Sequence, residues 1–300
     1  KNDLINNKYF SIIYNPHFID KGNTIQNLKK PDVLLIGTDN IDSKKKIINK
    51  YNKIYKNKKI YKILNLTEAE ITKIAINSFI TNKISFANNV SEIAEKFNNV
   101  NGANILNAIG QDSRIGKSYL KLGTKFSGPC FPRDNKSFAF FLKKIGINSY
   151  LQTSVDKINN LQTKRIIKKI KILKNHFNYR INIGILGLTY KPDTDIIIDS
   201  QSYDLIKKIN IKKLKVNKIK YYDKYVKKYN YKIGKNRIYF SSTLRNLVNY
   251  SDIIIIMYKD KEFRKIKRIK LKKTKAIIDC WNLVNKLKKP FIYTKLGEST

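Results

Sequence analysis

Short apolar runs separated by helical segments restrict the fold of this chain more than any other feature. Four of them lie in the C-terminal part, at residues 181–186, 219–222, 252–257 and 276–279. Strands that are apolar throughout are typical of parallel sheets whose two faces are both covered by helices. We therefore predict a doubly wound α/β domain over residues 179–300.

The N-terminal part repeats this alternation on a smaller scale. We predict strands at residues 10–14, 33–37 and 60–64 and a helix at residues 42–55. The alternation indicates the end of a parallel α/β sheet over residues 1–64. None of the twelve glycines forms a GxGxxG turn, so no dinucleotide-binding turn is assigned. No Met precedes Lys1, and we expect the first residues to lie inside a longer chain.

Residues 65–178 are predicted to form a central helical domain. Apolar residues recur at helical spacing from Thr67 to Phe97, and Thr67 to Glu70 resemble a capping box at the start of that helix. Further helices are predicted after Pro132 and over residues 151–177.

The charge is strongly positive, with 62 Lys and Arg against 22 Asp and Glu, a net +40. Such a balance raises the hypothesis of a nucleic-acid partner. Only eight of the basic residues are Arg, the residue preferred for bidentate contacts to phosphates and bases, and Lys recurs along the whole chain. We therefore interpret the charge as a solvated surface, expect no nucleic-acid partner, and note that the field attracts anionic nucleotides.

Cysteine and histidine are sparse. The chain has Cys130, Cys280, His17 and His176, with no CxxC or HExxH motif. This pattern predicts neither a disulfide framework nor a metal site, and it favours a reducing cytoplasm. No run of some eighteen apolar residues is present, so no membrane span is expected.

Two groups of residues carry chemistry. Pro132 suits the first turn of a helix, which places Cys130 near a helix N-terminus, where a thiolate is stabilised, with Asp134 one turn on. The alternative is that Cys130 is a small buried hydrophobe. Lys73 and Asn77 lie four residues apart on a predicted helix and suit the stabilisation of an oxyanion, unless they simply form its solvated face.

Several ordered segments resemble the UDP-glucose/GDP-mannose dehydrogenase family. They are NPHFIDKG at 15–22, AEITKIAIN at 69–77, IGQDSRIG at 109–116, GPCFPRD at 128–134 and GLTYKPDTD at 187–195. The resemblance implies the C-terminal remnant of a Rossmann-like NAD-binding domain, a central helical dimerisation domain and a C-terminal Rossmann-like domain that binds a UDP-sugar.

The resemblance also implies a reaction and its residues. A nucleotide sugar, UDP-glucose in the first place, is oxidised by NAD at C6 to the uronate, through a thiohemiacetal and a thioester on Cys130. Lys73 would stabilise the oxyanion, and Asn77 and Asp134 would position water and handle protons. Substrate contacts carry over to His17, Phe18, Lys73, Asn77, Arg114, Lys121, Phe126, Gly128, Tyr190 and Lys191. Lys21 and Cys130 match cofactor-side positions, and Arg114 matches an arginine that crosses a homodimer interface.

The chain departs from the family pattern at a few positions. His17 and Lys21 replace glutamates, and Lys125 and Ser127 stand in the usual GFGG segment. Ile198 and Trp281 occupy positions where arginine is usual, and most of the NAD-binding domain has no counterpart here. GDP-mannose and UDP-N-acetylmannosamine are alternative substrates. The rival functions are a non-catalytic remnant that binds a sugar nucleotide or dimerises and, less favoured, a nucleic-acid-binding protein.

Overall fold

A computed structural model describes residues 10–18, 24–55, 60–226, 231–271, 273–284 and 291–299. The chain divides into two compact units, Lys1–Ser78 and Phe79–Thr300. The second unit contains most of the predicted central helices together with the C-terminal sheet. The predicted three-domain division at residues 64 and 178 stays a prediction.

The first unit contains a two-stranded parallel sheet, in which β1 (Leu34–Gly37) pairs with β2 (Tyr61–Leu64). Its helices are α1 (Thr24–Lys29), α2 (Ile41–Asn52) and the start of α3 (Leu66–Ala94). The strand predicted at residues 10–14 is wrong, because only Tyr14 forms a bridge, with Gly37. Beyond it the side chain of Asn15 donates to the Leu35 carbonyl at 2.7 Å, and Pro16 has no N–H for a ladder.

Helix α3 begins with a reciprocal capping box. The side chain of Asn65 accepts a hydrogen bond from the Glu68 N–H at 2.8 Å, and the Glu68 carboxylate accepts one from the Asn65 N–H at 3.1 Å. Two of the N–H groups that a helix start leaves unpaired are thereby satisfied. The predicted box at Thr67 is wrong by two residues, because Thr67 already lies inside the helix.

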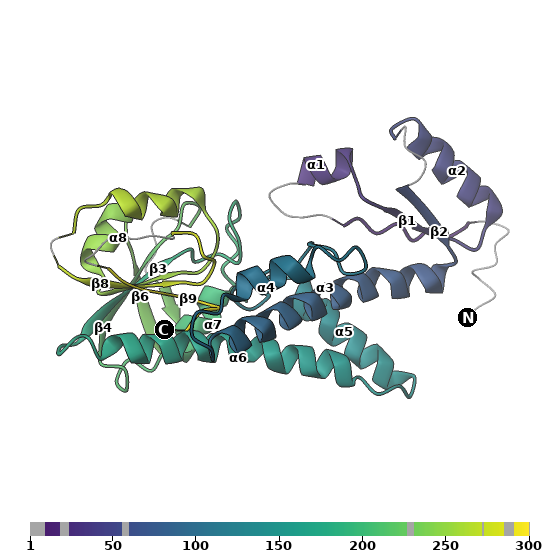
Figure 1. The fold of residues 1–300 in the computed structure, drawn as a ribbon. Helices are drawn as coiled ribbons and strands as arrows, with labels where there is room; N and C mark the ends of the chain where they lie inside the picture. The colour runs from purple at the N-terminus through teal and green to yellow at the C-terminus, as the bar shows by residue number, and fades with distance from the viewer. Residues whose placement is uncertain are drawn as a thin grey trace. The chain divides into compact units, whose positions relative to one another are not determined.

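The second unit contains the remainder of α3, α4 (Gly102–Ile109), α5 (Phe131–Lys144) and α6 (Tyr150–Lys174). Helices α5 and α6 pack against each other after a tight reversal of the chain (Figure 1). Helix α6 buries residues three or four positions apart, among them Val155, Asn159, Ile166, Ile170 and Leu173. This spacing forms one continuous face, which runs from the helical part of the unit to the sheet.

The sheet of the second unit has seven strands in the order β5-β6-β4-β3-β7-β8-β9. The strands are β3 (Ile181–Leu186), β4 (Val216–Tyr222), β5 (Tyr231–Ile233), β6 (Asn236–Phe240), β7 (Ile253–Ile256), β8 (Lys275–Asp279) and β9 (Phe291–Lys295). All neighbours are parallel except β5 and β6. The order reverses between β3 and β7, which is the Rossmann-type arrangement, and the predicted doubly wound domain is confirmed.

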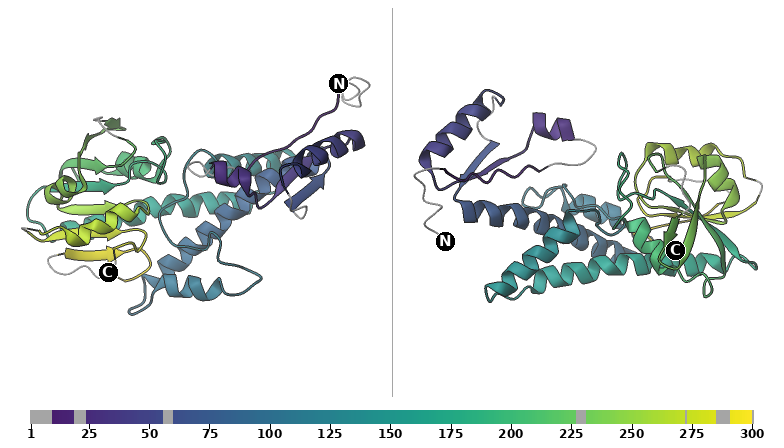
Figure 2. Two further views of the ribbon diagram at one scale, coloured as in Figure 1. Left: turned by 90° about the horizontal axis from the view of Figure 1, so that it is seen from above. Right: turned by 180° about the vertical axis from the view of Figure 1, so that it is seen from behind.

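Helices cover both faces of this sheet (Figures 1 and 2). Helices α6 and α7 (Gln201–Lys208) pack on one face, and α8 (Leu244–Tyr250) and the 3-10 helix η2 (Lys261–Arg268) pack on the other. In β7, Ile253 and Ile255 pack into the core on the α6 and α7 face, and Ile254 and Ile256 pack into the core on the α8 and η2 face. Burial on both sides explains why this strand is a run of isoleucine. None of the helices in the described part of the chain is long and apolar enough to cross a membrane.

Candidate active site

The loop of residues 120–128, which leads into Cys130 and α5, is held by asparagine side chains from two helices. Asn88 on α3 accepts a hydrogen bond from the Gly123 N–H at 3.1 Å and donates to the Thr124 carbonyl at 3.5 Å. Asn159 on α6 accepts from the Phe126 N–H at 2.7 Å and donates to the Phe126 carbonyl at 3.0 Å. These groups are buried, and the two asparagine side chains supply the hydrogen-bond partners that water would otherwise provide. The backbone of the loop is thereby fixed.

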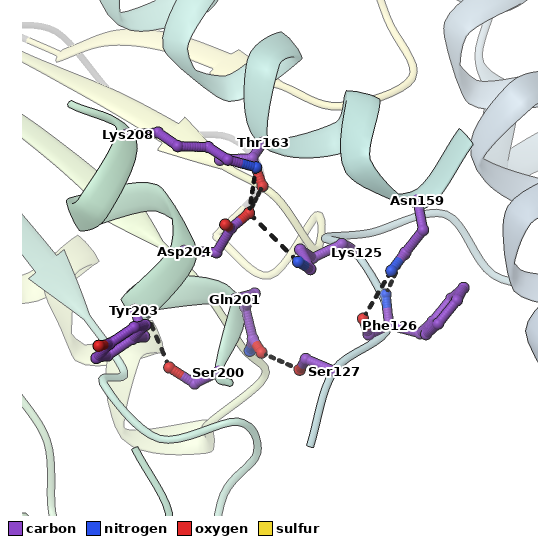
Figure 3. Close-up of polar contacts among 10 residues, drawn as sticks. All are labelled: Lys125, Phe126, Ser127, Asn159, Thr163, Ser200, Gln201, Tyr203, Asp204 and Lys208. Atoms are coloured by element: carbon purple, nitrogen blue, oxygen red, sulfur yellow. Dashed lines mark hydrogen bonds and ion pairs between the residues drawn. The ribbon is translucent and has the colours of Figure 1, made fainter. Parts of the chain in front are cut away.

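Helix α7 holds the same loop from the side of the sheet (Figure 3). Ser127 shares a 2.5 Å hydrogen bond with Gln201, and the ammonium of Lys125 lies 3.3 Å from the Asp204 carboxylate. Burial alone would raise the pKa of Asp204, but hydrogen bonds from Thr163 and Lys208 and the charge of Lys125 outweigh it and lower that pKa. Asp204 is therefore a carboxylate that joins the loop to α6 and α7.

Cys130 is exposed and forms the N-cap of α5, with Pro132 in the first turn as predicted. The Asp134 N–H donates to the Cys130 carbonyl at 2.8 Å, so the two residues lie one turn apart. The Asp134 side chain is buried and pairs with the Arg133 guanidinium at 2.8 Å. The pKa of Arg133 is raised, first by Asp134 and to a smaller extent by Cys130. An accessible thiol at a helix start beside a guanidinium suits nucleophilic chemistry.

Two glycines allow aromatic rings to approach the loop closely. Gly128 has φ +84°, and a Cβ there would lie 2.5 Å from the Tyr190 ring. A Cβ on Gly123 would lie 2.7 Å from the ring of Trp281, whose indole N–H donates to the Met257 carbonyl at 2.8 Å. The predicted substrate residues Gly128 and Tyr190 are thus brought together. The ring of Trp281 fills the space beside Gly123 in the same loop.

Lysine side chains lie at the carboxyl edge of the sheet. Lys259 follows β7, next to the point where the strand order reverses, and its pKa is lowered by loss of solvent and then by the positive charge of Lys121. The ammonium of Lys191 lies 5.7 Å from the centroid of the Tyr190 ring. Open α/β sheets bind ligands at this edge, and several ammonium groups there suit an anionic ligand.

The comparison with known sequences decides which family this arrangement represents. Residues 67–161 match the central domain of the UDP-glucose/GDP-mannose dehydrogenase family, and residues 184–286 match its UDP-binding domain. The chain belongs to this family.

Curated relatives include the UDP-glucose 6-dehydrogenases of Rickettsia typhi, 30% identical over 292 residues, and of Rickettsia bellii, 32% identical over 283 residues. Both alignments cover 92% of this chain, which spans only 64% and 63% of the two relatives. A UDP-glucose dehydrogenase structure from Pyrobaculum islandicum superposes with a TM-score of 0.79 at 22% identity, covering 96% of this chain and 63% of that one. That likeness supports the fold.

Other positions of the family pattern lie in the first unit. The Lys73 ammonium lies 5.1 Å from the centroid of the Phe18 ring, a cation–π contact between two predicted substrate residues. Asn77 is buried and His17 is exposed. Lys21, a predicted cofactor-side residue, lies outside the described residues. Cys130 and Asp134 belong to the second unit, and the proposed cooperation of the two sets stays a prediction.

Arg114 is exposed, and its guanidinium pairs with Asp112 at 2.6 Å. The Lys83 ammonium donates to the carbonyls of Ile115 and Gly116 at 2.9 and 3.3 Å, and so fixes the loop that carries Arg114 to α3.

Among the described residues, no group of three or more His, Cys, Asp or Glu side chains suits a metal ion.

The first strand-to-helix turn of the seven-stranded sheet, after β3, does not fit the pyrophosphate of a dinucleotide such as NAD, which the family resemblance assigns to the N-terminal domain instead. A Cβ on Gly187 would lie 2.4 Å from the Tyr258 ring, so this glycine makes room for a tyrosine. Asp223, at the end of β4, accepts hydrogen bonds from the Leu188 and Thr189 N–H groups at 2.8 and 3.1 Å. In dinucleotide-binding domains the N–H groups of this turn face the pyrophosphate, and the acidic residue binds ribose.

Sequence reasoning missed several of these residues. Asn88, Asn159 and Gln201 read as ordinary polar positions on helices, and no local pattern marks them. Lys259 did carry a signal, because it follows a buried strand at the edge where such sheets bind ligands.

Proposed function

We propose that this chain provides the substrate-binding and nucleophilic part of a nucleotide-sugar 6-dehydrogenase that acts on UDP-glucose with NAD as oxidant. One observation carries the proposal: the exposed Cys130 follows a loop that hydrogen bonds hold between α6 and α7 at the carboxyl edge of a Rossmann-type sheet. Membership of the family and the two Rickettsia UDP-glucose 6-dehydrogenases support it.

The chemistry assigned to this chain is capture of an aldehyde. The thiolate of Cys130 forms a bond to the C6 carbonyl carbon, and the carbonyl oxygen becomes an oxyanion that takes up a proton. Lys73 is assigned to that oxyanion, and Asn77 and Asp134 to the water that later hydrolyses a thioester, releasing the uronate and the thiol. The two oxidations need a hydride acceptor, and NAD is assigned to that role.

Substrate binding is assigned to the carboxyl edge of the sheet. Lys121, Lys191 and Lys259 supply positive charge for a pyrophosphate, and charge-assisted hydrogen bonds are the strongest that such a ligand offers. The rings of Tyr190 and Trp281 limit the space beside the loop.

A homodimer through the central helices is part of the proposal. Helix α3 exposes Phe79, Phe86 and Ile93 by 64%, 51% and 56%, and these residues recur every seven positions. Such a stripe of large apolar side chains is typical of a surface that a second helix covers. Arg114 would then reach the sugar nucleotide of the second copy. Sedimentation of the Phe86→Lys variant is expected to show a smaller assembly than that of the wild type.

The test separates binding from capture. UDP-glucose is expected to bind in calorimetry and to slow the alkylation of Cys130 by iodoacetamide. The 6-aldehyde of UDP-glucose is expected to form a thiohemiacetal on Cys130, detectable as an added mass by native mass spectrometry. Cys130→Ser should keep binding and lose the adduct, whereas Cys280→Ala should keep both, because the Cys280 thiol is fully buried and Cys130 is exposed.

The outcomes distinguish the alternatives. Tighter binding of GDP-mannose or UDP-N-acetylmannosamine would reassign the substrate. Binding without an adduct in the wild-type chain would support a non-catalytic binding protein. An unchanged adduct in Cys130→Ser would refute the assigned nucleophile.

A further inference from the structure

A small hollow on the C-terminal domain gathers positive charge away from the candidate active site. Its described lining consists of Arg245 and Asn249 from α8 and of Arg268, Ile269 and Lys270, which join η2 to β8, around a volume of about 230 Å³. No acidic residue is among them. Among the described residues, no carboxylate forms an ion pair with either arginine or with Lys270.

Arginine makes up a larger share of the basic residues in this hollow than in the whole chain. Only eight of the 62 basic residues in the chain are Arg, yet two of these eight line a hollow of five residues. Two guanidinium groups thus line one hollow in a chain whose basic residues are mostly lysine. Guanidinium presents a planar fork of N–H donors that matches phosphate oxygens in two places at once, which an ammonium does not do.

The C-terminal end of α8 does not repel an anion bound in this hollow. The C-terminal carbonyls of a helix carry partial negative charge. Here the buried Lys275 ammonium donates to the Asn249 and Ser251 carbonyls at 2.9 and 2.6 Å. A cation thus already compensates the helix end, and the Asn249 side chain adds an amide donor beside the two guanidinium groups.

We propose that this hollow binds a small phosphate-bearing anion, held by Arg245 and Arg268 with Lys270 and Asn249. Asn249, Arg268 and Lys270 lie in segments that lead into β7 and β8, so they approach the amino ends of these strands. The loop before Cys130 contacts Gln201 and Trp281, whose side chains both donate to the Met257 carbonyl just after the opposite, carboxyl end of β7. The site is therefore separate from the proposed catalytic function and does not depend on it.

Calorimetry with inorganic pyrophosphate tests the proposal, at constant ionic strength and with saturating UDP-glucose to occupy the other site. Arg268→Gln is expected to weaken pyrophosphate binding at least about tenfold, because one charge-assisted bidentate contact is lost. The matched control Arg237→Gln removes the same charge from the exposed face of β6 and should leave the affinity within about twofold.

Equal affinities in wild type and Arg268→Gln, or equal losses in Arg268→Gln and Arg237→Gln, would overturn the proposal. A random DNA duplex serves as a second probe. Binding of duplex that is lost in Arg268→Gln, without binding of pyrophosphate, would overturn the small-anion assignment in favour of a nucleic-acid surface.

Discussion

Replacement of Asn159 by leucine tests whether the loop before Cys130 is held as the structure indicates. The Asn159 amide makes two hydrogen bonds with the backbone of Phe126, of 2.7 and 3.0 Å, and both residues are only 5% exposed. Leucine branches at Cγ as asparagine does, but it is somewhat larger and has no polar atoms. The variant therefore leaves a buried N–H and a buried carbonyl without partners, at about 1–3 kcal/mol each. We expect the free energy of unfolding to fall by about 2–6 kcal/mol.

The chain offers a matched control one residue further along α6. Asn160 is exposed, and Asn160→Leu should change the free energy of unfolding by no more than about 0.5 kcal/mol. Urea unfolding followed by circular dichroism gives both values. Hydrogen exchange adds a local measurement, because only Asn159→Leu should accelerate exchange of the Phe126 amide.

Two results would refute this reasoning. An Asn159→Leu variant as stable as the wild type would show that water or a shifted loop replaces both hydrogen bonds. Equal losses in the two leucine variants would show that the effect comes from a polar-to-apolar change on α6 and not from the contact with Phe126.

Further predictions concern other contacts of the second unit. Glu95→Gln leaves the buried Arg165 and Lys169 side chains, now paired at 2.9 and 3.6 Å, without a counter-charge, so urea unfolding should show a loss of about 3–5 kcal/mol. Gly123→Ala places a Cβ 2.7 Å from the ring of Trp281 and should cost about 1–3 kcal/mol, with a smaller cost in a Trp281→Leu background; additive losses would contradict the contact. Burial, then the charge of Lys273, lowers the pKa of Lys275 from 10.5 to about 8. The Lys275 ammonium therefore loses its proton at a lower pH in the folded state than in the unfolded state. As a result, the free energy of unfolding of the wild type should rise by about 2 kcal/mol between pH 7 and pH 9.5, relative to that of Lys275→Met.

The central strands were predictable from the sequence, but the edges of the sheet were not. Residues 181–186 form a strand with the predicted bounds, because burial on both faces demands an apolar run. The edge strands β5 and β9 read YKI and FIYTK, and β6 reads NRIYF. Edge strands are only partly covered and often carry charged residues, so their sequences lose the apolar signal.

In the candidate site, local geometry was predictable and long-range contacts were not. The start of α5 at Cys130 followed from Pro132, and the close approach at Gly128 fits a glycine that tolerates φ +84°. Asn159 contacts a residue 33 positions away, and Gln201 contacts one 74 positions away. Such pairs depend on how α6 and α7 pack on the loop, which one sequence does not specify. The roles of Lys73, Asn77 and the other proposed site residues stay predictions.

The departures from glycine before Cys130 have a structural explanation. In the segment where the family pattern has GFGG, Lys125 and Ser127 stand in place of glycine, and each contacts α7: Lys125 pairs with Asp204, and Ser127 shares a hydrogen bond with Gln201. A glycine would make neither contact. The glycine that is kept, Gly128, is the one whose Cβ would collide with the Tyr190 ring. Side chains thus stand where the loop meets α7, and glycine stands where it meets an aromatic ring. This distribution favours a loop that is held in place before Cys130 over one that is losing its structure, because both side chains make contacts and the remaining glycine lies where a Cβ has no room.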